Sequence, residues 1–409
     1  MTKRNRIPRM QIKISHDGER TIILRLLCFY GLIYIAEAFF LPYITTYYSS
    51  QGMTPLKIGI LSSIGPICAI LVQPFWAARS DRSGKGILIL RIVIPATMIS
   101  VMLFPLSNNF SALLLINTVF FSFQTCIVPL GIAMTVSSLE NTGYSFSSVR
   151  IGGTLGYAIA AAASGSLIQS DHRWSFVLTG AAYLLLFLLT LTLHDKPRVI
   201  TKTAVSRQQS ARHLLFKPRI LFVLVLACAT QIVGSCYSSF LGPYMMESEF
   251  HEADIGRAMM ISALGELPVF LLMDRIRKQT STFIVLLIAS GILGIRTLLP
   301  SVTADFGVIA VAQFLGGVAY MLVYYNCVIF LGSETLEHLR SRAQSALVVV
   351  QVGIGSIVGN IGGGFLVGKK GIALTYQIFS GALLVLVMGM AIIYIFLIRK
   401  RTDQETDRN

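Results

Sequence analysis

The stretch from residue 92 to residue 139 reads IVIPATMISVMLFPLSNNFSALLLINTVFFSFQTCIVPLGIAMTVSSL and contains no charged residue. A helix needs about 20 residues to cross the hydrocarbon core of a bilayer, so this stretch is long enough for two crossings. The polar residues 107–109 divide it near its middle. We therefore predict two membrane-spanning helices joined by a short turn.

Apolar runs follow one another through the whole chain of 409 residues. Eight runs carry no charged residue: Ile58 to Ala78, Ile92 to Leu139, Ile151 to Ser170, Trp174 to His194, Ile220 to Met246, Phe306 to Ser333, Ala343 to Gly368 and Gly371 to Ile398. Three more are each interrupted by one charge deep in the run: Ile22 to Tyr48 with Glu37, Ile255 to Met273 with Glu266, and Thr282 to Pro300 with Arg296. Arg25 and Arg257 lie near the start of the first two. With the longest run counted twice, we expect twelve helices. Because their apolarity does not alternate, helices are favoured over a barrel, and we predict an all-α membrane protein.

The composition excludes an ordinary soluble protein. Hydrophobic residues make up 54% of the chain and charged residues only 13%, whereas soluble domains have roughly 25% charged residues. The net charge of +15 does not indicate a nucleic-acid partner, because the basic residues lie in short stretches between apolar runs rather than on a polar face. The six cysteines lie inside apolar runs without metal-ligand spacing. We expect no metal and no cofactor.

The distribution of Lys and Arg predicts the orientation in the membrane. If the N-terminus is cytoplasmic, most basic residues fall on the cytoplasmic side, as the positive-inside rule requires. We therefore predict a multi-pass protein of the cell membrane with both termini in the cytoplasm. The basic first 21 residues precede a full-length apolar run without a cleavage site, so we expect no removable signal peptide.

The chain divides into two halves with similar local sequences. The charged segment 196–219 separates six runs in residues 22–195 from six in residues 220–398, with tails at 1–21 and 399–409. Leu41-Pro42-Tyr43 is echoed by Leu241-Gly242-Pro243-Tyr244, and an Asp-Arg pair ends the second run of each half. Repeats of this kind place a solute site between the halves near the middle of the membrane.

Several short motifs of the chain resemble those of the major facilitator superfamily. Residues 76–85, WAARSDRSGK, are similar to its signature loop GxxxDRxGxK, with Ala77 in place of the first glycine. Residues 73–75, 146–157 and 265–268, together with Arg296, resemble the branch of the lactose and phenylpropionate permeases. The resemblance implies the major facilitator fold with two six-helix pseudo-repeats and proton-coupled uptake of a small organic solute.

The same resemblance assigns candidate residues. Arg150, Glu266 and Arg296 match functional positions of the lactose permease. The His and Glu of that permease's span 10 fall near Gly316 and Ala319, its span 7 acids fall in the uncharged residues 234–240, and the acid of its span 4 has no clear match. We therefore do not expect lactose itself as the solute.

Charged side chains inside the spans are the first candidates for coupling. A charge at the centre of a span costs roughly 2.5 to 3.5 kcal/mol, so it usually faces a partner or a water-filled cavity. Burial raises the pKa of a carboxyl group and a nearby Arg lowers it, so a Glu that alternates between these settings binds and releases a proton. We predict this role for Glu37, and for Glu266 with Arg296. The alternatives are a structural pair and a Glu that only hydrogen-bonds neighbouring helices.

Polar and aromatic residues inside the spans are candidates for solute binding. Arg150 reaches the cavity if its helix begins near Phe146, and otherwise extends toward the headgroups. The remaining candidates are Tyr30, Tyr34, Gln124, Gln231, Tyr237, Tyr324 and Asn326. Buried amides need partners, although an aromatic residue at helical spacing more often only packs.

Charged residues at the cytoplasmic ends of the second and eighth spans are predicted to form a gate. They are Asp81, Arg82, Lys85, Asp274 and Arg275. A carboxylate there can meet a helix N-terminus or an Arg across the interface and hold this side shut. The alternative is that the basic residues serve only membrane topology.

These patterns predict a secondary transporter, not an enzyme. We expect a monomeric proton symporter in the lipid bilayer that takes up a small solute such as a sugar, a nucleoside or an aromatic acid. No Walker loop is present, so ATP does not drive it directly. The first alternative is proton-driven efflux of amphipathic compounds. Drug antiporters of the superfamily usually carry a Gly-Pro pair in the fifth span, whereas here Gly156 is followed by Tyr157, which counts against efflux. A membrane enzyme or sensor is the second alternative.

Overall fold

The computed structural model of the protein describes residues 16–139, 142–169, 171–195, 217–335 and 339–406. These residues form helices and no strand, so the predicted all-α fold is confirmed. In the first half the elements are α1 (His16–Ser50), α2 (Pro55–Leu71), α3 (Gln73–Ser83), α4 (Gly86–Val101), η1 (Phe104–Leu106), α5 (Phe110–Leu139), α6 (Phe146–Ile168) and α7 (Arg173–Leu191). In the second half they are α9 (Pro218–Glu247), α10 (Glu252–Gln279), α11 (Thr282–Val302), α12 (Phe306–Glu334), α13 (Arg340–Val348), η3 (Val349–Gly355), α14 (Ser356–Lys370) and α15 (Ile372–Thr406).

Most of these helices are long and apolar enough to cross a membrane. Within the described residues, eleven helical segments meet that condition by length and composition. The twelfth expected crossing corresponds to α10, whose sequence carries several charged residues in addition to Glu266. The uncharged stretch 92–139 forms α4 and α5, and they are separated by η1 and the polar residues 107–109, as predicted.

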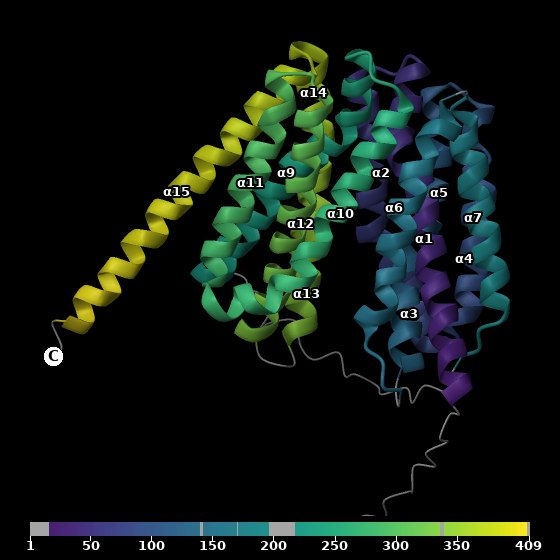
Figure 1. The fold of residues 1–409 in the computed structure, drawn as a ribbon, viewed down its shortest axis with the longest axis horizontal. Helices are drawn as coiled ribbons and strands as arrows, with labels where there is room; N and C mark the ends of the chain where they lie inside the picture. The colour runs from purple at the N-terminus through teal and green to yellow at the C-terminus, as the bar shows by residue number, and fades with distance from the viewer. Residues whose placement is uncertain (1–15, 140–141, 170, 196–216, 336–338, 407–409) are drawn as a thin grey trace, which may run out of the picture.

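The helices form two groups that stand side by side (Figure 1). Within the first group α1 packs on α6 and α7, while in the second group α11 packs on α12 and α15. The groups meet through α1 against α9, α2 against α14, and α6 against α10. Helix α1 already begins at His16, upstream of the predicted boundary at residue 22. Residues 196–216 lie outside the described part, so the predicted linker stays a prediction.

Two of the expected spans contain a break in the α-helical pattern. In the second span α2 ends at Leu71, and α3 follows after Val72. Helix α3 ends at Gly84, whose φ of 64° is easily adopted by a residue without a side chain. This accounts for the glycine in the loop motif. In the eleventh span the seven residues of η3 form a π-helix between α13 and α14, a distortion that frequently occurs at functional sites.

Large apolar side chains cover the outside of the bundle. Helix α15 leans away from the other helices at its C-terminal part (Figure 1). Along it Val385, Met388, Ile392 and Phe396 are exposed, each by 58% or more. A soluble protein rarely exposes such a continuous apolar surface, whereas a membrane protein presents it to lipid.

Candidate functional site

Glycines bring the backbones of the two halves together at one end of the bundle. This sealed end comprises the end of α1, the start of α2, the end of α6 and the start of α10. A Cβ atom built on Gly165 would collide with the backbone of Ala253, and one on Gly256 would collide with the carbonyl oxygen of Ala161. No larger residue fits at either position without separating α6 from α10. The two halves therefore make direct backbone contact here.

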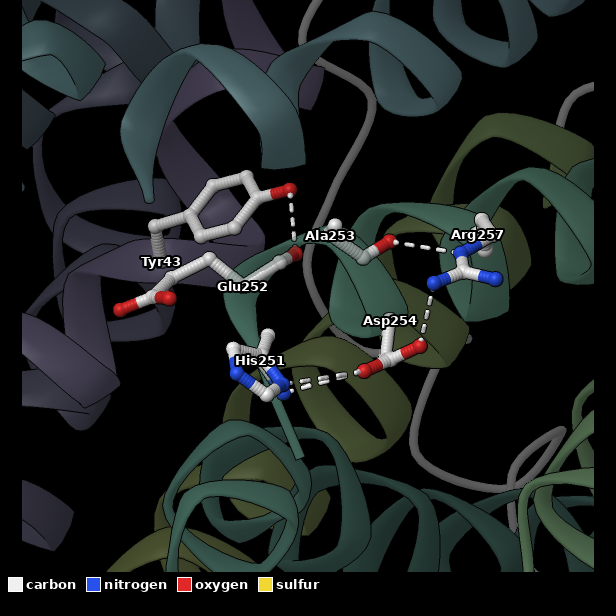
Figure 2. A network of polar contacts seen from close by, with 6 residues as sticks. All are labelled: Tyr43, His251, Glu252, Ala253, Asp254 and Arg257. Carbon is white, nitrogen blue, oxygen red and sulfur yellow. Dashed lines mark hydrogen bonds and ion pairs between the residues drawn. The ribbon is translucent and has the colours of Figure 1, made fainter. Parts of the chain in front are cut away.

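Polar side chains add specific contacts between α1, α6 and α10 at the sealed end. The hydroxyl groups of Tyr43 and Ser164 share a hydrogen bond of 2.8 Å. The Tyr43 hydroxyl also donates to the carbonyl oxygen of Glu252 at 3.4 Å, a contact drawn in Figure 2. The Glu252 side chain lies 3.5 Å from Nε2 of His172, so a carboxylate of the second half meets an imidazole of the first.

Helices α2 and α14 close the same end on the other side. The Asn360 amide donates to the carbonyl oxygen of Ser62 at 3.0 Å, and a Cβ on Gly59 would collide with the Asn360 backbone. Because Asn360 also accepts a hydrogen bond of 2.9 Å from Ser239, its position is fixed from both halves. The sealed end therefore leaves no room for a solute between α2 and α14.

The opposite end of the bundle, where α7 ends and α9 begins, is the linker end. Its short helices α3 and α13 make their main contacts within their own halves, to α2, α4 and α5 and to α12 and η3, respectively. Of the predicted gate residues, Asp81, Arg82, Lys85 and Arg275 are exposed. The side chain of Asp274 lies outside the described residues. A gate at this end requires a state in which the linker end is closed, and it stays a prediction.

A cavity of about 510 Å³ lies between the halves. Helices α9, α10, α11, α12 and α14 of the second half supply most of its wall, and α1, α2 and α6 supply the rest. The charged residues lining it are Glu266 and Arg296. The polar and aromatic residues lining it are Thr230, Gln231, Ser235, Ser238, Ser239, Ser262, Gln313, Gln351, Ser356, Asn360, Tyr157, Tyr237 and Tyr320. A small solute with hydroxyl or carboxyl groups and a ring fits this lining.

Arg150 lies on α6, which packs on α1 with Glu37 in its own half and on α10 with Glu266 in the other half. Helix α6 begins at Phe146, which confirms the condition under which Arg150 reaches the interior. Its guanidinium carbon lies 4.1 Å from the centre of the Tyr34 ring, and a Cβ on Gly153 would lie 2.6 Å from its Nη1 atom. The charge of Arg150 acts on both Glu37 and Glu266. A single cation of the first half therefore interacts electrostatically with one carboxylate of each half.

Two side chains link Glu37 to the rest of the site. Gln124 donates a hydrogen bond of 3.2 Å to Oε1 of Glu37. Tyr157 lines the cavity, and its hydroxyl interacts electrostatically with both Glu37 and Glu266. Tyr157 therefore belongs to the same electrostatic group as the two carboxylates.

Arg296 has a different environment from the one predicted. Its guanidinium lies 4.1 Å from the centre of the Tyr237 ring and donates to Oε1 of Gln313 at 3.1 Å. Among the described side chains it forms no ion pair with Glu266, so the predicted pair is not found. The charge that acts on Glu266 comes from Arg150 instead. A coupling role for Arg296 stays a prediction.

The other predicted solute-binding residues fall into two groups. Gln231 and Tyr237 line the cavity, and the Gln231 amide donates to Ser235 and Ser356. The others are absent from its lining in the described part of the chain: Arg150, Tyr30, Tyr34, Gln124, Tyr324 and Asn326. Tyr30 packs in the core of the first half, Tyr324 stacks on Tyr320, and the Asn326 amide bonds its own helix at Leu322.

The sequence analysis missed Gln313, Tyr157 and Asn360. Gln313 and Asn360 are amides inside apolar runs, so the criterion that selected Gln124 and Gln231 selects them as well. Tyr157 was noted only as a replacement for Pro in a motif. Its interaction with two carboxylates depends on how α6 meets α1 and α10, for which the sequence holds no signal.

Comparison with known proteins identifies the family. Residues 23–378 match the profile of the MFS_1 like family. The maltose permease of Geobacillus stearothermophilus is 24% identical, with 92% of this chain and 95% of the permease covered. The probable 3-phenylpropionic acid transporter of Escherichia coli (strain K12) is 25% identical, with 66% and 74% covered.

Solved structures show the same fold. A crystal structure of a mutant of the nucleoside transporter NupG superposes with a TM-score of 0.82 at 18% identity, covering 91% of this chain and all of that one. The predicted major facilitator fold is therefore confirmed. The chain belongs to the MFS_1 like family, and it is a multi-pass membrane transporter rather than an enzyme.

Proposed function

We propose that this member of the family is a proton-coupled symporter that brings a small organic solute into the cell by alternating access. The observation that carries this proposal is the position of Arg150 on α6, a helix that packs on α1, which carries Glu37, and across the interface on α10, which carries Glu266. A single cation shared across the interface ties the electrostatics of Glu266 to the relative position of the halves.

The interaction of Arg150 with carboxylates of both halves suggests how proton binding is coupled to the relative movement of the halves. Arg150 and Glu37 belong to α6 and α1, which pack together within one half. Glu266 belongs to α10, so its separation from Arg150 changes when the halves rock against each other. A carboxyl group that loses a nearby cation holds its proton more firmly. Glu266 would therefore take up a proton in one state and release it in the other, while Glu37 keeps its partner.

The cavity supports a small polar or aromatic solute. Its amide and hydroxyl side chains can bind oxygen atoms, and its tyrosines can cover a ring. A sugar, a nucleoside and an aromatic acid fit this description, and the names of the relatives include each class. We further propose that the linker end faces the cytoplasm with both termini, in the cell membrane, and that the monomer is active with H⁺ as the coupling ion.

Replacing Glu266 by Gln tests the coupling. The variant resembles the protonated form permanently, so it binds solute but cannot release a proton. In proteoliposomes we expect Glu266→Gln to exchange labelled solute for unlabelled solute and to lose accumulation driven by an imposed pH gradient. Wild-type protein should accumulate solute more strongly as the outside becomes more acidic.

A matched variant shows whether the effect belongs to this carboxylate. Glu247→Gln makes the same change at the exposed end of α9 and should retain full accumulation. Continued proton-driven accumulation by Glu266→Gln would contradict the coupling assignment, and loss of exchange as well would indicate a structural role.

A further inference from the structure

Arg296 is a buried cation with an incomplete set of partners. The residue is only 9% exposed, and its Nε atom is buried without a hydrogen-bond acceptor. The hydroxyl group of Tyr237, over whose ring the guanidinium lies, is also buried without a partner. Unpaired buried donors are unfavourable. Both residues line the cavity, so a hydrogen-bond acceptor that enters the cavity can accept from these unpaired donors.

Gly316 and Gln313 hold the guanidinium beside the cavity without neutralising it. A Cβ on Gly316 would lie 2.6 Å from the guanidinium carbon, so only glycine leaves this space for the side chain. Gln313 accepts one hydrogen bond from Nη2, but its amide carries no charge. Because Arg296 lines the cavity and Gln313 accepts only one of its hydrogen bonds, the remaining donors are left for an acceptor in the cavity.

The charges that line the cavity balance only when no proton is bound. Arg296 contributes one positive charge and Glu266 one negative charge. If Glu266 takes up a proton, the site keeps one net positive charge. A net charge in a low-dielectric interior is costly unless a counter-charge is present. A solute with one negative charge supplies that counter-charge, whereas a sugar or a nucleoside does not.

We propose that Arg296, Tyr237 and Gln313 form a carboxylate subsite, and that the solute is a ring-bearing monocarboxylate that binds together with one proton. The inference rests on the proposed symport and names its substrate class. The carboxylate has two oxygens, which can accept from the guanidinium and from the phenol. The proton and the anion each make binding of the other more favourable, which is the reciprocal coupling that symport requires.

Several groups lie around Glu266, the group that receives the proton. Arg150 and Tyr157 from α6 and Tyr320 from α12 interact with its charge, and Glu37 from α1 interacts with the same three residues. Arg296 from α11 and Tyr237 from α9 line the same cavity. Arg150 is the only cation of this set whose charge acts directly on the carboxylate in the described residues. The carboxylate of the solute therefore pairs with Arg296.

The experiment compares matched probes on the full-length protein in detergent. Thermal stabilisation is measured with 3-phenylpropionate and cyclohexanecarboxylate, with the amides of both acids, and with maltose and uridine. We expect the carboxylates to stabilise the protein, more strongly at acidic than at alkaline pH, and the neutral probes to bind at least about tenfold more weakly. This binding test needs no gradient, so it reports on the subsite even if the transport mechanism differs.

Two variants locate the carboxylate. Arg296→Gln should weaken carboxylate binding by at least about 100-fold, as expected for a buried charge pair. Since this variant removes a buried side chain and could fail to fold, Gln313→Glu provides a second test at nearly constant volume. The new carboxylate lies beside Arg296 and competes with the solute, so binding should fall by a similar factor. Gln377→Glu, an exposed change in α15, adds the same charge away from the cavity and should bind like the wild type.

The proposal is overturned if the amides bind as well as the acids, or if none of the carboxylates stabilises the protein. It is also overturned if Gln313→Glu keeps carboxylate affinity. Failure of Glu266→Gln to abolish accumulation, with carboxylate binding intact, would contradict the symport and not the subsite.

Discussion

Arg150 and Arg296 are packed in the same way but face different charges. Each guanidinium lies 4.1 Å from the centre of a tyrosine ring of the first helix of its half, α1 or α9. Each also occupies space left by a glycine, Gly153 or Gly316. The charge of Arg150, however, interacts with two carboxylates, while Arg296 donates its hydrogen bond to the neutral amide of Gln313. Similar packing in the two halves has therefore been combined with two different electrostatic roles.

The difference suggests a division of labour between the halves. In the first half, Arg150 influences proton binding by the carboxylates. In the second half, Arg296 binds the carboxylate of the solute. Most of the cavity wall also comes from the second half. Changes at the two arginines should consequently alter different properties of transport.

The largest effect is expected from Arg150→Gln. Two partly buried carboxylates lose their compensating cation, and leaving a buried charge without its partner costs roughly 3 to 5 kcal/mol. We expect proton-driven uptake to fall by at least about 100-fold, with loss of the pH dependence of solute binding. Arg150→Lys keeps the charge but not the planar stacking on Tyr34, so it should retain part of the activity. Uptake into proteoliposomes and binding over a pH series measure both effects.

Two comparisons test whether the arginines differ. Arg296→Gln should weaken carboxylate binding at every pH and leave the shape of the pH profile unchanged. Adding Glu37→Gln to Arg150→Gln removes one uncompensated negative charge and should restore solute exchange. If both single variants produced the same pH profile, the division of labour would be wrong.

The sequence predicted the fold well because lipid imposes a simple rule. Uncharged stretches such as 92–139 had to become helices, and the polar residues 107–109 had to mark their ends. The sequence did not predict where the α-helical pattern is interrupted within a span. The π-helix at 349–355 lies inside a run that is uncharged throughout and carries no Pro to mark a break. The η3 residues pack against α9 and α2, and such contacts between distant segments are not visible in the sequence.

The sequence predicted the charged residues of the site but not their pairing. Glu37, Glu266 and Arg296 stand out because charges are rare in spans. Which cation serves Glu266 depends on the contact between α6 and α10, two helices far apart in the chain. Adjacent spans α10 and α11 suggested Arg296 as the partner, whereas the packing of the halves gives that role to Arg150.

A medium effect is expected from the glycines beneath the arginines. In Gly316→Ala the new Cβ would lie 2.6 Å from the guanidinium carbon of Arg296, which is nearly fully buried and has little room to move. We expect roughly tenfold weaker solute binding, since overpacking typically costs about 1 to 3 kcal/mol. In Gly153→Ala the new Cβ would lie 2.5 Å from Cδ2 of Tyr34 and 2.6 Å from Nη1 of Arg150. Both side chains are less buried than Arg296, so the effect should be smaller. Binding isotherms for the two variants measure the difference.

Gly291→Ala is the control for the glycine series. It lies on α11, the helix that carries Arg296, and no atom lies within 4 Å of its Cβ position. It should bind solute normally and gain up to about 1 kcal/mol in stability from helix propensity. Equal losses in Gly153→Ala and Gly316→Ala would mean that the two arginines are equally constrained.

The smallest effect is expected from Gln124→Met, which removes the hydrogen bond of 3.2 Å to Glu37 at nearly constant volume. A hydrogen bond to a charged group contributes about 1.5 to 3 kcal/mol, but Arg150 still acts on this carboxylate and should offset part of the loss. Because Glu266 and not Glu37 carries the coupled proton, the pH dependence of uptake should stay that of the wild type, with a change in rate below about tenfold. Uptake measured across a pH series checks this, and a shifted pH profile would show that Glu37 itself takes part in proton binding. Gln313→Met, the matching change beside Arg296, should lower carboxylate affinity and likewise leave the pH profile unchanged.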